Sequence, residues 1–191
     1  SACLVGSEMC IRDSNKIFRI PDFQRGYSWE ERQLEDFWED IQNLSPNKIH
    51  YIGLLTVEPI KESDILNIEK WKDDLWLFKK GLSAYYVIDG QQRLTTLVIL
   101  LHEMLLTFSD DEGINYGQKS EWIDRFLYRS YNSIYKSFVF GYEKDNPSDE
   151  YFKTKILEQE SSTADKYPET LYTANLMFAK KYLAEMLKVL N

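Results

Sequence analysis

The residues with the clearest chemical potential form one short run, Asp89-Gly90-Gln91-Gln92-Arg93, followed at once by Leu94-Thr95-Thr96. Apolar residues 85–88 precede this run and predict a strand, while the apolar spacing over 94–108 predicts a largely buried helix. A helix entered through a glycine leaves the backbone N–H groups of residues 90–93 together at the positive end of the helix dipole. Such a point attracts anions, so the run predicts a phosphate site.

Three side chains of this run are suited to binding. Arg93 adds a fixed charge whose fork matches phosphate oxygens. The hydroxyls of Thr95 and Thr96 are suited to ligating a phosphate or a magnesium ion. With the Gly90 backbone, these residues predict a site for the phosphates of a nucleotide.

The catalytic candidates are Asp89, Gln91, Gln92 and Arg93. Asp89, at the end of the strand, is suited to hold Mg²⁺ directly or through water. Either Gln91 or Gln92 is suited to position an attacking water, as a glutamine does in GTPases. This inventory fits the hydrolysis of a nucleoside triphosphate with Mg²⁺.

A structural interpretation of the same residues stays open. Asp89 with Gln92 three residues later is also a capping box, in which the carboxylate itself satisfies the N–H groups offered to phosphate. Arg93 is equally suited to a structural ion pair, and Thr95 and Thr96 to the first turn of a helix. The crowding of polar side chains at the start of an otherwise apolar helix favours the phosphate site.

A second candidate, Gln24-Arg25, lies between a predicted strand at residues 16–20 and a predicted helix. Such a loop is suited to bring another arginine to the same phosphates. The alternative is an ion pair of Arg25 with Glu30 or Glu31. The nearby Tyr27 and Trp29 are suited to stack on a base, although aromatic residues that flank a helix are more often core residues.

The elements that must position these residues follow from periodicity and from turn residues. Ser28, with Glu31 three residues on, predicts the N-cap of a helix that reaches residue 44. Residues 51–60 predict a buried strand, and 61–83 a strand or hairpin. Asn146-Pro147 predicts the start of a helix to about residue 158. The remaining predictions are a loop over 109–117, a helix and then a strand over 122–142, and a last helix over 171–190.

Composition limits the classes of function. Of 191 residues, 31 are acidic and 23 basic, a net charge of −8, so tight DNA binding by this chain alone is not expected. Only His50 and His102 occur, and neither of two common nuclease signatures, a metal site built on histidines and a Glu-x-Lys or Asp-x-Lys triplet, is present. The two cysteines lack the partners of a zinc site. No apolar run is long enough to cross a membrane, so we expect a soluble cytoplasmic protein with no membrane contact.

Three segments together resemble a known family. They are 20–29 (IPDFQRGYSW), 51–53 (YIG) and 87–97 (VIDGQQRLTTL). They resemble the N-terminal domain of GmrSD-type, modification-dependent (type IV) restriction endonucleases, whose core is similar to the ParB/sulfiredoxin fold. The resemblance implies an α+β fold, with a small mixed sheet and packed helices followed by a helical C-terminal part. It predicts a core over residues 1–108 and a mainly helical extension over 109–191.

The family also implies a function. It implies NTP binding and hydrolysis, with residues 89–93 at the phosphates and Gln24 and Arg25 contributing. It further implies a nuclease partner of the His-Asn-His type, which is absent from this chain, and DNA contact through the full assembly, with an oligomer possible. We therefore expect an NTP-hydrolysing regulatory domain of an anti-phage restriction protein. The alternatives are a non-catalytic sensor of nucleotide or modified DNA, and a structural assembly domain.

Overall fold

The structure is a computed structural model that describes residues 15–44, 53–67, 69–110, 113–114, 117–131, 135–160 and 169–190. The start of the strand predicted at 51–60 lies outside these residues. The first predicted helix ends within them, at Gln42 rather than at residue 44.

One mixed sheet organises the described part of the chain. Its strands lie in the order β2-β3-β1-β8. β1 is parallel to β3 and to β8, while β2 is antiparallel to β3. The strands are β1 (Lys16–Ile20), β2 (Thr56–Pro59), β3 (Ser83–Asp89) and β8 (Phe140–Tyr142). Two small hairpins lie outside it, β4 (Gly113–Ile114) with β5 (Gly117–Gln118), and β6 (Tyr128–Tyr131) with β7 (Tyr135–Phe138).

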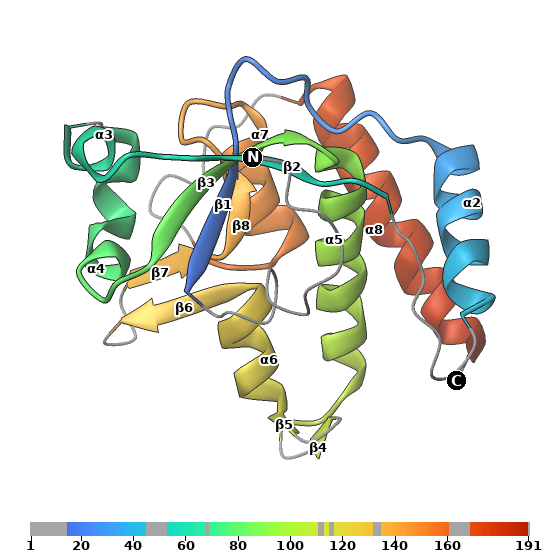
Figure 1. The fold of residues 1–191 in the computed structure, drawn as a ribbon. Helices are drawn as coiled ribbons and strands as arrows, with labels where there is room; N and C mark the ends of the chain where they lie inside the picture. The colour runs from blue at the N-terminus through green and yellow to red at the C-terminus, as the bar shows by residue number, and fades with distance from the viewer. Residues whose placement is uncertain are drawn as a thin grey trace.

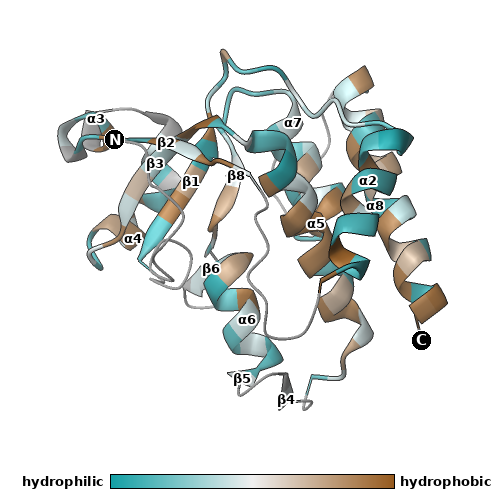
Figure 2. Ribbon diagram, turned by 45° about the vertical axis from the view of Figure 1, so that its right-hand side comes forward, coloured by the Kyte–Doolittle hydropathy of each residue, from teal (hydrophilic) through white to brown (hydrophobic). Residues whose placement is uncertain are grey.

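Helices pack beside this sheet in successive layers (Figure 1). The helix α5 (Gln91–Thr107) lies next to the sheet, α8 (Leu171–Leu190) packs along α5, and α2 (Glu31–Gln42) packs on α8. Figure 2 shows α5 as largely hydrophobic, as expected for the central layer. The expected α+β class, with a small mixed sheet and a C-terminal helix, is confirmed. Among the described residues, no helix combines the length and the apolar character needed to cross a membrane.

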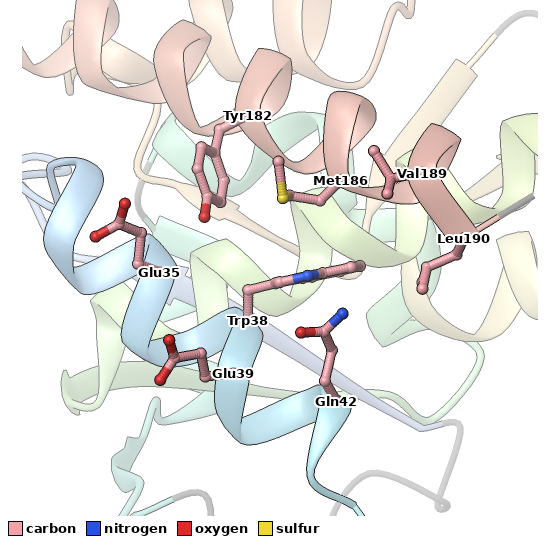
Figure 3. A pocket seen from close by; sticks show the side chains of 8 residues that line it. All are labelled: Glu35, Trp38, Glu39, Gln42, Tyr182, Met186, Val189 and Leu190. Carbon is pink, nitrogen blue, oxygen red and sulfur yellow. The ribbon is translucent and has the colours of Figure 1, made fainter.

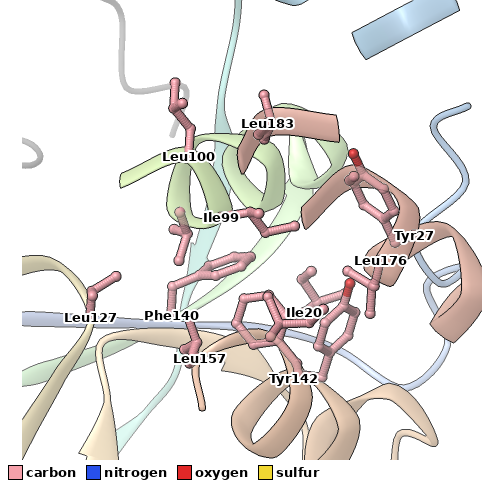
Figure 4. Close-up of a cluster of buried hydrophobic side chains, with 14 of the residues drawn as sticks. Ile20, Tyr27, Ile99, Leu100, Leu127, Phe140, Tyr142, Leu157, Leu176 and Leu183 are labelled. Carbon is pink, nitrogen blue, oxygen red and sulfur yellow. The ribbon is translucent and has the colours of Figure 1, made fainter. Parts of the chain in front are cut away.

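The main core joins the two halves of the chain (Figure 4). Ile99 of α5 packs with Phe140 of β8 and Leu176 of α8, all of them buried. The late strand β8 pairs with β1 and so completes the sheet. The described residues of 109–191 therefore share one sheet and one core with those of 1–108.

The predicted strand or hairpin at residues 61–83 is wrong. This stretch is helical, with α3 (Glu62–Asn67), the 3-10 helix η1 (Glu69–Asp74) and α4 (Leu75–Phe78). Trp71 and Leu77 belong with Ile17 to a second, smaller cluster of buried hydrophobic residues. Arg19 of β1 forms a buried ion pair with Asp74 at 2.7 Å, which ties this helical segment to the sheet.

Three further boundaries differ from the sequence predictions. The N-cap of α2 is Glu30, whose capping box uses Gln33, and not Ser28. Of the described residues 53–60, Thr56–Pro59 alone form the strand expected over 51–60, and this part is half-exposed or exposed rather than buried. The region 119–142 holds the helix α6 (Lys119–Phe126) and three strands instead of one.

The helix predicted from Asn146-Pro147 is present but irregular. It consists of α7 (Ser148–Tyr151) and a π-helical turn, η2 (Phe152–Ile156). The N-cap of α7 is Pro147, without a side-chain cap, and not Asn146 as the sequence predicts. Oδ1 of Asn146 still accepts a hydrogen bond from the Ser148 amide at 2.9 Å.

Candidate functional site at the start of the central helix

Strand β3 passes directly into α5 through Gly90. This residue has φ 87° and ψ 6°, a left-handed conformation that favours glycine. A Cβ atom at this position would lie 2.9 Å from the carbonyl oxygen of Leu54, so the neighbouring segment also requires a glycine here. The predicted sharp entry into the buried helix is therefore present.

The Asp89–Gln92 capping box is absent. Oδ1 of Asp89 accepts a hydrogen bond from the Gly90 amide at 2.8 Å, and the N-cap residue Gly90 has no side chain to cap α5. The carboxylate of Asp89 is exposed. Among the described residues, the amides that follow Gly90 in the first turn of α5 therefore have no recorded side-chain acceptor at the positive end of the helix dipole.

Gln92 instead holds the loop that precedes α2. Its Nε2 donates to the Gly26 carbonyl at 3.1 Å, and its Oε1 accepts from the Ser28 amide at 2.9 Å. Both ends of this buried amide are therefore occupied by backbone groups. The use of the Ser28 amide by Gln92 also explains why α2 begins two residues later than the sequence predicts.

Gln91 makes a parallel contact but keeps one group unpaired. Its Nε2 donates to the carbonyl of Arg25 at 3.2 Å and to Oε1 of Gln24 at 3.4 Å. Among the described residues its buried Oε1 has no hydrogen-bond partner. A buried acceptor without a partner is costly, so this oxygen is suited to accept from a bound water or ligand.

The second candidate loop does lie beside the first. Nε2 of Gln24 donates to the Ile88 carbonyl at 3.1 Å, one residue before Asp89. Glu143 fixes the other side of the loop, because its Oε2 accepts from the Asp22 amide at 2.9 Å. In Figure 1 the segment between β1 and α2 passes over the end of the sheet where α5 begins. The structure therefore brings Gln24 and Arg25 to the start of α5, with the Arg25 side chain exposed.

Arg93 packs against Gly53. A Cβ atom on Gly53 would lie 1.3 Å from Nη1 of Arg93, so the guanidinium fills the space that a side chain would need. Gly53 has φ 109°, a second reason for glycine here. The sequence places Gly53 in a predicted strand and in one of the three family segments, but its contact with Arg93 was not predicted. The one signal for this contact is that both residues belong to the family segments.

Thr95 and Thr96 face the core. Both are almost completely buried, and their hydroxyls donate to the carbonyls of Gln91 and Gln92 at 2.8 and 2.9 Å. The hydroxyl of Tyr27 shares a 2.8 Å hydrogen bond with Thr96, and burial raises the pKa of Tyr27. These contacts give the two threonines a structural role, which the sequence analysis had kept as the alternative.

The groove between α2 and α8 is a separate hollow of about 330 Å³ (Figure 3). Its lining residues are Glu35, Trp38, Glu39, Gln42, Tyr182, Met186, Val189 and Leu190. Burial and then the nearby Glu35, Glu31 and Glu39 raise the pKa of Tyr182, a sign of negative potential. An acidic groove disfavours phosphate, and none of the predicted site residues lines it.

Comparison with known proteins adds the decisive observation. The model of one family, described as "GmrSD restriction endonuclease, N-terminal domain", matches residues 8–190. The chain belongs to this family. No curated protein matches the chain. The GmrSD N-terminal domain thus covers both halves of the chain, in agreement with their shared core.

Because the chain belongs to this family, it is a component of a restriction protein, which is a kind of defence protein. It also implies that a nuclease part accompanies the GmrSD N-terminal domain in the full protein. In the described part of this GmrSD domain, no group of three or more His, Cys, Asp and Glu side chains is arranged to hold a metal ion. A metal ion at the start of α5 would therefore need ligands from a substrate as well.

Proposed function

We propose that this domain binds nucleoside triphosphates at the start of α5 and hydrolyses them, and that this reaction regulates the nuclease part of a modification-dependent restriction protein. The observation that carries the proposal is the first turn of α5, entered through left-handed Gly90, where the amides after Gly90 have no recorded side-chain acceptor among the described residues. Backbone amides at the N-terminus of a buried helix are a favourable place for a phosphate group.

The binding groups come from two segments. The amides that follow Gly90 and the guanidinium of Arg93 bind phosphate oxygens from the helix side. Arg25, on the loop held by Gln91 and Gln92, binds them from the opposite side. Two arginines and a helix N-terminus together offset the repulsion that the net charge of −8 imposes on a polyphosphate.

A magnesium ion fits this donor set when a nucleotide is bound. Mg²⁺ is held in such sites by one or two carboxylates together with phosphate oxygens and water. Asp89 is exposed and, within the described residues, its carboxylate has one recorded hydrogen bond, which Oδ1 accepts from the Gly90 amide. Asp89 is therefore the residue that would hold the ion, which would neutralise charge on the phosphates.

In the reaction, a water molecule attacks the γ-phosphorus, and the bond from this phosphorus to the β–γ bridging oxygen breaks. The products are a nucleoside diphosphate and inorganic phosphate, and the water releases a proton to solvent. Gln91 is the better placed of the two glutamines to orient this water, because its buried Oε1 has no partner among the described residues. Gln92, with both amide atoms occupied, is a positioning residue for the loop.

The partner in this proposal is a nuclease of the His-Asn-His type, and DNA is contacted through the full assembly. The acidic balance of the chain supports this division, since a surface with net charge −8 is a poor DNA-binding surface by itself.

Backbone NMR during a titration with ATP and Mg²⁺ tests the binding step. The proposal predicts that the largest amide shifts occur at Gly90, Gln91, Gln92 and Arg93, with smaller shifts in the loop around Arg25. Shifts that are confined to the groove between α2 and α8, or no shifts at all, would reject it.

A further inference from the structure

The loop beside the proposed phosphate site presents one exposed aromatic ring. Three aromatic residues lie between Ile20 and Glu30, namely Phe23, Tyr27 and Trp29. Tyr27 is buried, and Trp29 packs edge-on against Phe37 with 5.8 Å between ring centroids. Tyr27 is thus a core residue, as the sequence alternative held, and the partly buried Trp29 packs against the core. Phe23, by contrast, is 74% exposed.

The backbone around Phe23 is fixed on both sides. The Asp22 amide donates to Glu143, and the Gln24 amide donates to the Pro21 carbonyl at 3.1 Å, which closes a turn over the phenylalanine. The side chain of Gln24 adds its bond to the Ile88 carbonyl. An apolar ring on a loop tied at three points loses little conformational freedom when it contacts a ligand.

The backbone at Phe23 also lies close in the chain to the loop residues that contact the start of α5. Phe23 is two residues from Arg25, so their Cα atoms are at most about 7.6 Å apart. Gln91, in the first turn of α5, contacts the Arg25 carbonyl directly. A nucleotide whose phosphates occupy the start of α5 and Arg25 therefore has its base within reach of this loop.

We propose that the nucleobase of the bound triphosphate stacks on the ring of Phe23, an inference that rests on the proposed function. Every base has a π-face, so stacking tolerates different bases. The inference thus assigns the substrate class as nucleoside triphosphates with weak preference among bases, held by the triphosphate and by one aromatic contact.

Calorimetric titrations of the purified protein with ATP, GTP and inorganic tripolyphosphate, each with Mg²⁺, test this inference. We expect Phe23→Ala to weaken both nucleotides about tenfold and to leave tripolyphosphate within about twofold, because the latter has no base. Phe23→Trp should restore nucleotide binding. Phe178→Ala is the matched control, because Phe178 is a 41%-exposed phenylalanine on α8, outside the loop.

The possible failures are distinguishable. If Phe23→Ala weakens the binding of nucleotides and of tripolyphosphate equally, the ring only orders the loop. If the variant weakens neither, the base does not touch the ring. Either result overturns the stacking role. Wild-type protein that binds tripolyphosphate as tightly as ATP also overturns it, while the phosphate site stands. Wild-type protein that binds none of the three ligands overturns the proposed function itself.

Discussion

The guanidinium of Arg93 occupies the space above Gly53, where a Cβ atom would come within 1.3 Å of Nη1. Two motifs that are 40 positions apart in the chain are thereby one structural unit. Gly53 admits the arginine, and Gly90 admits the segment around Leu54 that carries Gly53 close to α5. The position of the proposed phosphate-binding arginine therefore depends on a residue that has no reactive group.

Gly53→Ala should displace Arg93 without altering its chemistry. We expect nucleotide affinity to fall about as far as in Arg93→Ala, because the guanidinium can no longer lie against residue 53. Gly81→Ala is the matched control, since Gly81 also has a positive φ, 83°, but a Cβ atom there would meet nothing within 4 Å. Both variants should lose about 1–2 kcal/mol of stability from the backbone strain. Equal nucleotide affinities in the two variants would contradict the account of Arg93.

Gln92→Leu should loosen the loop that carries Arg25. The change removes two hydrogen bonds and leaves the Gly26 carbonyl and the Ser28 amide without their partner. We expect a loss of about 2–3 kcal/mol in the free energy of unfolding and faster hydrogen exchange at the Ser28 amide. Gln33→Ala, which removes an exposed capping contact to Glu30, should cost about 1 kcal/mol. Unchanged exchange at Ser28 would show that the loop does not depend on Gln92.

Stability should depend on pH through Asp149. Burial raises the pKa of this carboxyl to about 6, even though the ion pair with Lys153 acts in the opposite direction. Because the folded state holds the proton more tightly than the unfolded state, the contribution of Asp149 to stability is full below pH 4 and declines as the pH rises to about 6. The decline amounts to roughly 3 kcal/mol.

Asp149→Asn cannot ionise and provides the comparison. Urea unfolding of both proteins from pH 4 to pH 7 should show the wild type losing stability relative to the variant as the pH rises. The other titrating groups are common to both proteins and cancel in this difference. A difference in unfolding free energy that stays constant over this range would show that Asp149 keeps its ordinary pKa.

The sequence predicted the parts of the fold whose signals are local. β1, the β3–α5 junction and α8 were correct because strand and helix periodicity there agrees with the burial that the tertiary structure provides. Residues 61–83 were misassigned because their tryptophans pack from short helical turns into a separate small core, and such turns are too short to show a helical period.

The candidate site was predicted as a set of residues but not as a geometry. Gln91 contacts the side chain of Gln24 and the backbone carbonyl of Arg25, and Gln92 contacts the carbonyl of Gly26 next to them. The sequence did not show which polar side chains of α5 face the core. Thr95, Thr96 and Arg93 point in different directions around the helix, and the elements that pack against each side of α5 were unknown. The roles of these residues in nucleotide chemistry stay predictions.

Phosphate release from ATP and GTP in the presence of Mg²⁺ tests the central claim most directly. The assay compares the wild type with Asp89→Ala and Arg93→Ala. The control is Arg32→Ala, because Arg32 is an exposed arginine on α2. Circular dichroism first establishes that each variant is folded. The account predicts slow turnover by the wild type and by Arg32→Ala, and its loss in the two site variants. Binding of nucleotide without release of phosphate would identify a sensor instead of an enzyme, and turnover that is unchanged in both Asp89→Ala and Arg93→Ala would contradict the assignment of this site.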